Sequence, residues 1–205
     1  MSTTRTRRPI VLSLLAAVAA VIALVAGSAT ASAAPGPLKP IAKLDVARYM
    51  GVWNQVAAIP QPFNLDCLRN TQARYTLLDP NNVKVENRCT KIGGQRGGIN
   101  GNARVNDQKT KAQLHVSFPG VPYQSNKSGP TNYIVTYIAP DYSWALVGSP
   151  DRLSGFVLKR DKGVNSSQWR SIKNVISSRG YNPCFFLTSP IDGAYRNIQP
   201  LCTVR

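Results

Sequence analysis

The amino-acid sequence predicts an all-β protein, an eight-stranded antiparallel up-and-down β-barrel with one C-terminal α-helix packed outside it. Two observations support this prediction. Eight short segments with alternating apolar and polar residues follow one another at even spacing, and no long crossover separates them. One later segment, 165–179, instead has apolar residues at helical spacing.

The first expected strand starts at the sequence Gly51-Val52-Trp53 and continues to Ile59. A glycine before a strand allows a tight turn or the close approach of another segment. The indole of Trp53 needs a buried site and an acceptor for its N–H group. We therefore expect Trp53 to plug one end of the barrel.

Alternation defines the remaining strands. Segments 70–78 and 83–89 each have an apolar and a polar face, and the turn-forming sequence 79–82 joins them into a hairpin. The clearest alternation lies in 112–118, which places His115 on the outer face. The other strands are expected at 99–105, 133–138, 144–147 and 155–160, with a short ninth strand within 184–188.

The expected helix begins at Asn165 and ends before Gly180. Asn165 is a favourable N-cap, and Gln168 three residues later completes a capping-box pattern. Trp169, Ile172 and Ile176 recur at helical spacing, so one apolar stripe is expected to pack on the outside of the barrel.

The first 33 residues predict a cleaved signal peptide. Three arginines precede the apolar run 10–25, and Ala31-Ser32-Ala33 offers a cleavage site with small residues. The arginine pair within 6–11 resembles a twin-arginine signal, so this export route is one possibility. We expect a secreted or extracytoplasmic protein without a lipid anchor, because no cysteine lies near the cleavage site.

Removal of the predicted signal peptide leaves 172 of the 205 residues. Residues 34–43 form a leader rich in proline, and 44–205 are expected to form a single domain. The net charge of +16 becomes +13, because the leader carries three arginines and no acid. Such a charge favours contact with acidic polymers or anionic membrane surfaces. The charges are scattered, which argues against a specific nucleic-acid face.

The four cysteines predict two disulfides in an exported chain. Cys67, Cys89, Cys184 and Cys202 allow three pairings, and we expect each early cysteine to pair with a late one, tying the C-terminal tail to the barrel wall. No zinc site is expected, since the chain has no Cys-X-X-Cys sequence and His115 is its single histidine. No cofactor is predicted.

Three motifs resemble those of the lipocalin family, and most closely its branch of outer-membrane lipoproteins and apolipoprotein D. They are the stretch 44–53 with Gly51 and Trp53, the stretch 140–152, and the sequence Phe156-Val157-Leu158-Lys159-Arg160. They appear in family order over nearly the whole expected domain. The resemblance implies a barrel that holds a small ligand, with Arg160 lying across Trp53 at the closed end. The attachment cysteine of bacterial lipoproteins is absent, so we expect a soluble exported form.

The predicted function is to bind or carry a small hydrophobic ligand, such as a fatty acid or a lysophospholipid, in the barrel cavity. Apolar side chains would bury the ligand, and tyrosine hydroxyls with Asn87 would orient its polar group, which we expect to be acidic. At each position a purely structural packing role is equally consistent with the pattern. The expected lining residues are Tyr75, Leu77, Val85, Asn87, Ile99, Leu114, Val116, Phe118, Tyr133, Val135, Tyr137 and Phe156.

An alternative function is a basic extracellular module in which the barrel is only a scaffold for binding anionic polymers or membrane surfaces. The net charge favours this alternative, and the scatter of the charges weakens it. An enzyme is not predicted, because the sequence has no Gly-X-Ser-X-Gly motif, no nucleophile beside a histidine and no metal-ligand cluster.

Overall fold

The computed structural model describes residues 36–62 and 66–205, so the predicted signal peptide lies outside the described residues. Each segment with an alternating pattern forms a strand, within a few residues of the predicted bounds. The strands are β1 (Gly51–Ala58), β2 (Cys67–Asp79), β3 (Asn82–Lys91), β4 (Arg96–Val105), β5 (Gln113–Ser117), β6 (Tyr133–Ile138), β7 (Trp144–Gly148) and β8 (Gly155–Lys159).

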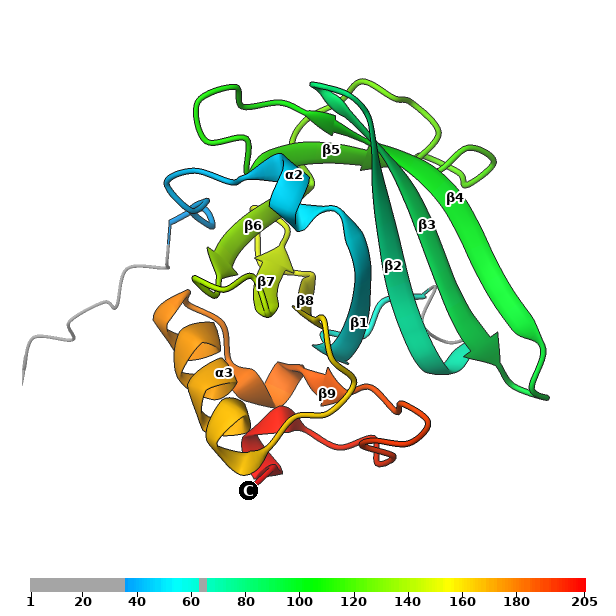
Figure 1. Cartoon of the computed structure of the whole chain (residues 1–205), viewed down its shortest axis with the longest axis vertical. Helices are drawn as coiled ribbons and strands as arrows, with labels where there is room; N and C mark the ends of the chain where they lie inside the picture. The colour runs from blue at the N-terminus through cyan, green and yellow to red at the C-terminus, as the bar shows by residue number, and fades with distance from the viewer. Residues whose placement is uncertain (1–35, 63–65) are drawn as a thin grey trace, which may run out of the picture. The chain divides into compact units, whose positions relative to one another are not determined.

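The eight strands form a closed antiparallel barrel (Figure 1). Each of β2 to β7 pairs with the next strand in sequence, and β8 then pairs with β1. The barrel closes where β1 pairs with β2, from Gly51 opposite Tyr75 to Asn54 opposite Gln72. The predicted fold class is confirmed.

A short helix, α2 (Val46–Tyr49), precedes β1 and was not predicted. Asp45 caps its N-terminus, because the carboxylate accepts a hydrogen bond from the backbone N–H of Arg48 at 3.1 Å. Four residues are too few to show a helical period, so the pattern of apolar residues gave no signal. The helix matters for the site because Tyr49, its last residue, is buried in the barrel interior.

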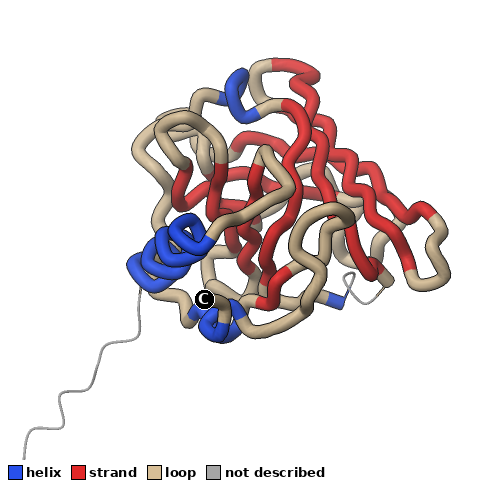
Figure 2. Tube along the Cα trace, turned by 60° about the horizontal axis from the view of Figure 1, so that its bottom comes forward, coloured by secondary structure: helices blue, strands red, loops and turns tan. Residues whose placement is uncertain are grey.

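The predicted C-terminal helix is α3 (Ser166–Ser178), and the capping box of Asn165 and Gln168 is present. Figure 2 shows this helix beside the strands, on the outer side of the barrel. Its buried residues Trp169, Ile172 and Ile176 pack in one cluster with Leu146 of β7 and Val157 of β8. The amphipathic helix therefore covers an apolar outer face of the wall, as predicted.

The predicted pairing of early with late cysteines is wrong. Cys67 bonds to Cys89, and Cys184 bonds to Cys202. The first pair is local because β2 and β3 are adjacent strands of one hairpin. The second pair is local because the tail folds back on itself, with Leu187 bridged to Pro200.

The tail reaches the barrel through backbone pairing instead. The short strand β9 (Leu187–Thr188) pairs with the end of β1, where Ala57 lies opposite Thr188. Further along the tail, the Asn70 N–H of β2 donates to the Pro190 carbonyl at 2.9 Å. Residues 187–190 thus fill the part of the wall where β1 and β2 no longer pair with each other.

Residues 36–43, the described part of the predicted leader, lie along the barrel. The N–H groups of Leu38 and Ile41 donate to the carbonyls of Pro150 and Val135, both at 2.9 Å. Leu38 is buried in the outer cluster. No helix within 36–62 and 66–205 is long and apolar enough to cross a membrane.

Candidate functional site: the barrel interior

The side chains on the inner face of the barrel form one apolar cluster, separate from the cluster under α3. Strand alternation explains the separation, because successive residues of a strand point to opposite faces of the sheet. Most of the predicted lining residues belong to the inner cluster. These are Tyr75, Val85, Leu114, Val116, Phe118, Tyr133, Val135 and Phe156.

Tyr137 was predicted to line the cavity, but it packs in the outer cluster, where its ring lies 4.5 Å from that of Trp144. The cause is an irregularity in the β6–β7 ladder, whose register shifts between Val135 and Tyr137. A β-bulge of this kind reverses the faces of the residues that follow. Ile138 takes the inner position instead.

Three further predicted residues lie outside the inner cluster. Leu77 is 44% exposed and sits near the end of β2, at the rim of the barrel beside α2. Asn87 and Ile99 face each other across β3 and β4 and are partly exposed. The amide of Asn87 therefore has access to solvent, while Leu77 belongs to the edge and not to the interior.

Trp53 closes one end of the interior. Its side chain is fully buried, and its indole N–H donates to the Tyr49 carbonyl at 2.8 Å. The Arg160 guanidinium lies 3.7 Å from the Trp53 ring centroid and donates to the carbonyls of Val52 and Arg48. Gly51 has φ +95°, and a Cβ atom there would lie 3.3 Å from the guanidinium. Glycine thus allows both the turn and the approach of the arginine.

Three tyrosine hydroxyls meet inside the barrel. Tyr49 comes from α2, Tyr75 from β2 and Tyr133 from β6. The Tyr133 oxygen lies 2.7 Å from that of Tyr49 and 3.1 Å from that of Tyr75. The rings of Tyr49 and Tyr75 stack with their centroids 5.5 Å apart. We call these three residues the tyrosine cluster. Tyr49 was missed from the sequence because α2 was missed.

The tyrosine cluster carries one more hydrogen-bond donor than it uses internally. Each phenol has one O–H, so the cluster holds three protons but only two hydrogen bonds among its own oxygens. In each of the three possible arrangements of these bonds, one O–H remains to donate to another acceptor. A ligand oxygen placed against the cluster could accept this hydrogen bond.

Burial keeps the tyrosine cluster neutral. It raises the pKa of Tyr75 to about 12. It also raises the pKa of Tyr49 and Tyr133 well above 10. Both neighbouring phenols add to the rise for Tyr133, whereas for Tyr49 Tyr75 adds to it and the Tyr133 hydrogen bond and the Arg160 charge oppose it. At physiological pH the three groups therefore act as uncharged donors.

The raised pKa values predict an alkaline loss of stability. The free energy of unfolding should stay level up to about pH 10, where free phenols ionise, and fall as the pH rises towards 12 and beyond. The reason is that the unfolded chain releases these protons at a lower pH than the folded chain. Urea unfolding between pH 8 and 12, together with phenolate absorbance, measures both effects. Tyr75→Phe should flatten the slope, and an unchanged slope in this variant would contradict the assignment.

Within residues 36–62 and 66–205, the interior contains no buried charge that could neutralise an anion. Among the described residues, Lys159 is the only buried charged side chain. It lies on the face opposite to Leu158 of the inner cluster, and its ammonium pairs with Asp161 at 3.1 Å. The polar character of the interior therefore comes from neutral hydroxyl and amide groups.

His115 lies on the outer face, and its ring contacts the loop between β5 and β6. Nδ1 is 2.7 Å from the Pro130 carbonyl oxygen, and Nε2 is 2.9 Å from that of Asn126. A Cβ atom on Gly129 would collide with the imidazole, so the loop packs closely against it. His115 therefore positions a loop and does not contribute to the interior.

The barrel is closed, has one plugged end and encloses an apolar interior with converging hydroxyls. Such a fold is suited to binding a small hydrophobic ligand. The Lipocalin-like domain model matches residues 44–190. The chain belongs to the lipocalin family, as the sequence motifs indicated.

Two relatives and one solved structure illustrate the family relationship. Temperature-induced lipocalin-1 of Arabidopsis thaliana is 34% identical over 140 residues, which cover 68% of this chain and 75% of the relative. Outer membrane lipoprotein Blc of Escherichia coli K12 is 27% identical over 177 residues, covering 86% and 94%. Insecticyanin from the tobacco hornworm Manduca sexta has a TM-score of 0.60 at 17% identity, covering 81% and 96%, which supports the fold.

Proposed function

We propose that this protein is an exported carrier that holds one small hydrophobic ligand, such as a fatty acid or a lysophospholipid, inside the barrel. The tyrosine cluster is the observation that carries the proposal, because it places a spare O–H donor within an apolar interior. A ligand with an apolar body and one oxygen acceptor matches this arrangement. Membership of the lipocalin family supports a role as a binding protein and not as an enzyme.

The polar group of the ligand is proposed to enter the interior in a neutral form. The sequence led us to expect an acidic group, but a carboxylate would lose its water without gaining a buried cation. An ester, an alcohol or a protonated acid can accept the same hydrogen bond at a smaller desolvation cost. The acidic group remains the alternative that the following experiment distinguishes.

Replacing Tyr49, Tyr75 and Tyr133 together with phenylalanine should weaken binding of an oxygen-bearing ligand by about threefold to tenfold, the effect of one net hydrogen bond. All three are changed because removal of a single phenol leaves at least one O–H that is not used within the cluster. Fluorescence titrations with cis-parinaric acid and with its methyl ester measure the affinity. The ester should bind at least as tightly as the acid.

Tyr137→Phe is the matched control, because it removes the same atom from a ring that packs outside the interior. It should leave both affinities within a factor of two. Equal losses in the triple variant and in Tyr137→Phe would contradict the role of the cluster. Absence of saturable binding of either probe to the unaltered protein would contradict the carrier function itself.

Export is proposed from the predicted signal peptide together with the disulfides. The bonds Cys67–Cys89 and Cys184–Cys202 fit an extracytoplasmic location, since disulfides persist in oxidising compartments. The proposed form is not lipid-anchored.

A second candidate function is binding to anionic polymers or membrane surfaces. The observation that favours it is the balance of 25 lysines and arginines against nine acidic residues. Co-sedimentation with vesicles of anionic phospholipid, repeated at rising salt, tests it. Binding that disappears at moderate salt and does not depend on the tyrosine cluster would favour this function over the carrier function.

A further inference from the structure

A hollow of about 640 Å³ lies at the end of the barrel where α2 sits. It is bounded by the segment that leads into α2 and by the turns β2–β3, β4–β5 and β6–β7. These turns meet at one end because alternate connections of an up-and-down barrel share an end. The volume is that of an ordinary small-molecule site.

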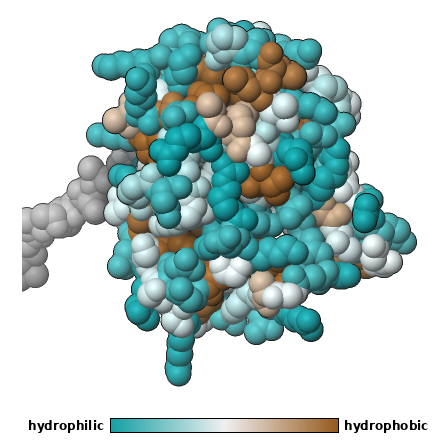
Figure 3. All heavy atoms as spheres, in the orientation of Figure 1, coloured by the Kyte–Doolittle hydropathy of each residue, from teal (hydrophilic) through white to brown (hydrophobic). Residues whose placement is uncertain are grey.

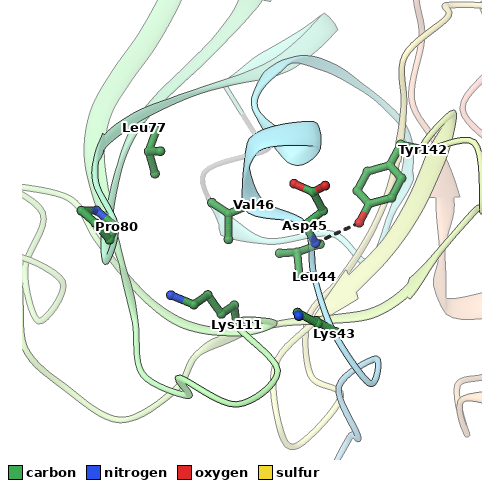
Figure 4. A pocket seen from close by; sticks show the side chains of 8 residues that line it. All are labelled: Lys43, Leu44, Asp45, Val46, Leu77, Pro80, Lys111 and Tyr142. Carbon is green, nitrogen blue, oxygen red and sulfur yellow. Dashed lines mark hydrogen bonds between the residues drawn. The ribbon is translucent and has the colours of Figure 1, made fainter.

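One side of the hollow is apolar. Leu77, Pro80 and Val46 lie on this side in Figure 4. Leu77 and its neighbour Leu78 are exposed large hydrophobic residues, at 44% and 59%. Figure 3 shows apolar atoms gathered in the upper part of the molecule, near the end where α2 lies in Figure 1. An apolar chain laid along Leu77 and Val46 would cover this surface.

The other side of the hollow is basic. Lys43 and Lys111 lie along the lower edge of the hollow in Figure 4, below Leu77 and Val46. Asp45 is the acid of the lining, and its carboxylate is turned to α2, where it accepts from the Arg48 N–H. The Lys111 ammonium donates to the Gln108 side-chain oxygen at 3.3 Å, which leaves two of its three protons for a ligand.

The backbone around the hollow is unusual as well. Lys111 and Tyr142, which line it from two turns, have φ +55° and +60°. Five non-glycine residues of the described chain have positive φ, and two of them line this one hollow. Left-handed backbone at residues other than glycine tends to persist where function requires it. The Asp79 and Asp107 carboxylates of the neighbouring turns accept hydrogen bonds from the backbone N–H groups of Asn81 and Lys109 and do not line the hollow.

We propose that this hollow is a second binding site, which takes an amphiphile whose head is a carboxylate or a phosphate monoester and whose tail is a single apolar chain. The head lies between Lys43 and Lys111, and the first part of the tail lies against Leu77, Pro80 and Val46. This site is at the plugged end of the barrel and does not depend on the proposed function of the interior.

The test follows the backbone amide signals of Lys43, Asp45 and Lys111, which line the hollow and lie outside the inner cluster, by NMR during titration with decyl phosphate, decanoate or decanol. Because the signals report on this site, its affinity is measured whether or not the interior binds a ligand. Both anions should shift these signals saturably, and decanol should bind more weakly. A stronger response to decyl phosphate would assign a phosphate head, and a stronger response to decanoate a carboxylate head.

The double variant Lys43→Gln and Lys111→Gln should weaken binding of the anions about threefold to tenfold and change decanol binding less than twofold. Its control is the double variant Lys39→Gln and Lys109→Gln, which removes the same charge from the same two segments at exposed residues outside the lining. Equal losses in the two double variants would mean that only the general charge matters, which would overturn the site.

A matched pair of leucine variants tests the apolar side of the hollow. Leu77→Ser should weaken binding of all three probes, while Leu78→Ser should not, because Leu78 does not line the hollow. Both leucines are exposed, so neither change removes a core contact. Amide shifts confined to residues of the inner cluster would overturn the proposal.

Discussion

Replacing Trp53 with alanine is expected to lower the free energy of unfolding by about 3–5 kcal/mol, the range for large aromatic residues in cores. The indole is fully buried and belongs to the inner cluster. Its loss leaves a cavity at the plugged end, frees the Tyr49 carbonyl and removes the surface under the Arg160 guanidinium. Urea unfolding followed by circular dichroism measures the change.

Two variants show whether this loss comes from the position of Trp53. Tyr123→Ala removes a fully exposed aromatic ring and should change stability by less than about 0.5 kcal/mol. Trp53→Phe keeps a ring under Arg160 but lacks the N–H donor, so its loss should be intermediate. If Trp53→Ala were no more destabilising than Tyr123→Ala, the indole would not be the plug of the barrel.

Removing the Cys184–Cys202 disulfide by changing both residues to alanine is expected to cost about 3 kcal/mol of stability. The bond closes a loop of 18 residues, and its absence would leave the unfolded chain with more conformations. The same loop includes β9, which pairs with β1, so loosening of the tail should also weaken this part of the wall. The free energy of unfolding and the hydrogen exchange of the Ser189 amide, which bonds to the Val56 carbonyl, measure the two effects.

The pairing itself can be tested before any variant is made. Digestion without reduction should release one peptide pair that joins Cys67 to Cys89 and another that joins Cys184 to Cys202. A peptide that links Cys67 or Cys89 to the tail would overturn this arrangement. Removal of the Cys67–Cys89 bond serves as the comparison, because this bond closes a loop of similar length. The variant without it should still protect the Ser189 amide from exchange.

The strands and the outer helix could be predicted because their signals are local and repeated. The hairpin of β2 and β3 shows apolar residues at every second position on either side of a strong turn sequence. The helix α3 has both a capping box and an apolar stripe. The packing of α3 on the barrel could be predicted as well, because the residues that define its apolar stripe are those that contact the wall.

The parts that could not be predicted depend on single local events or on contacts between distant residues. The bulge between Val135 and Tyr137 leaves no trace in the alternation, so Tyr137 was placed on the wrong face. The hydrogen bond between Tyr49 and Tyr133 connects residues that are 84 positions apart in the sequence. The cysteine pairing depends on how the tail turns back, which the spacing of four cysteines does not determine.

The contribution of the tail to the wall limits when the fold can be completed during synthesis. Residues 187–190 fill the gap beside β1, and Leu201 and Val204 are buried in the outer cluster. A nascent chain that still lacks these segments has all eight strands but an open seam along one side. The ribosome must therefore make the tail before this part of the wall can be completed.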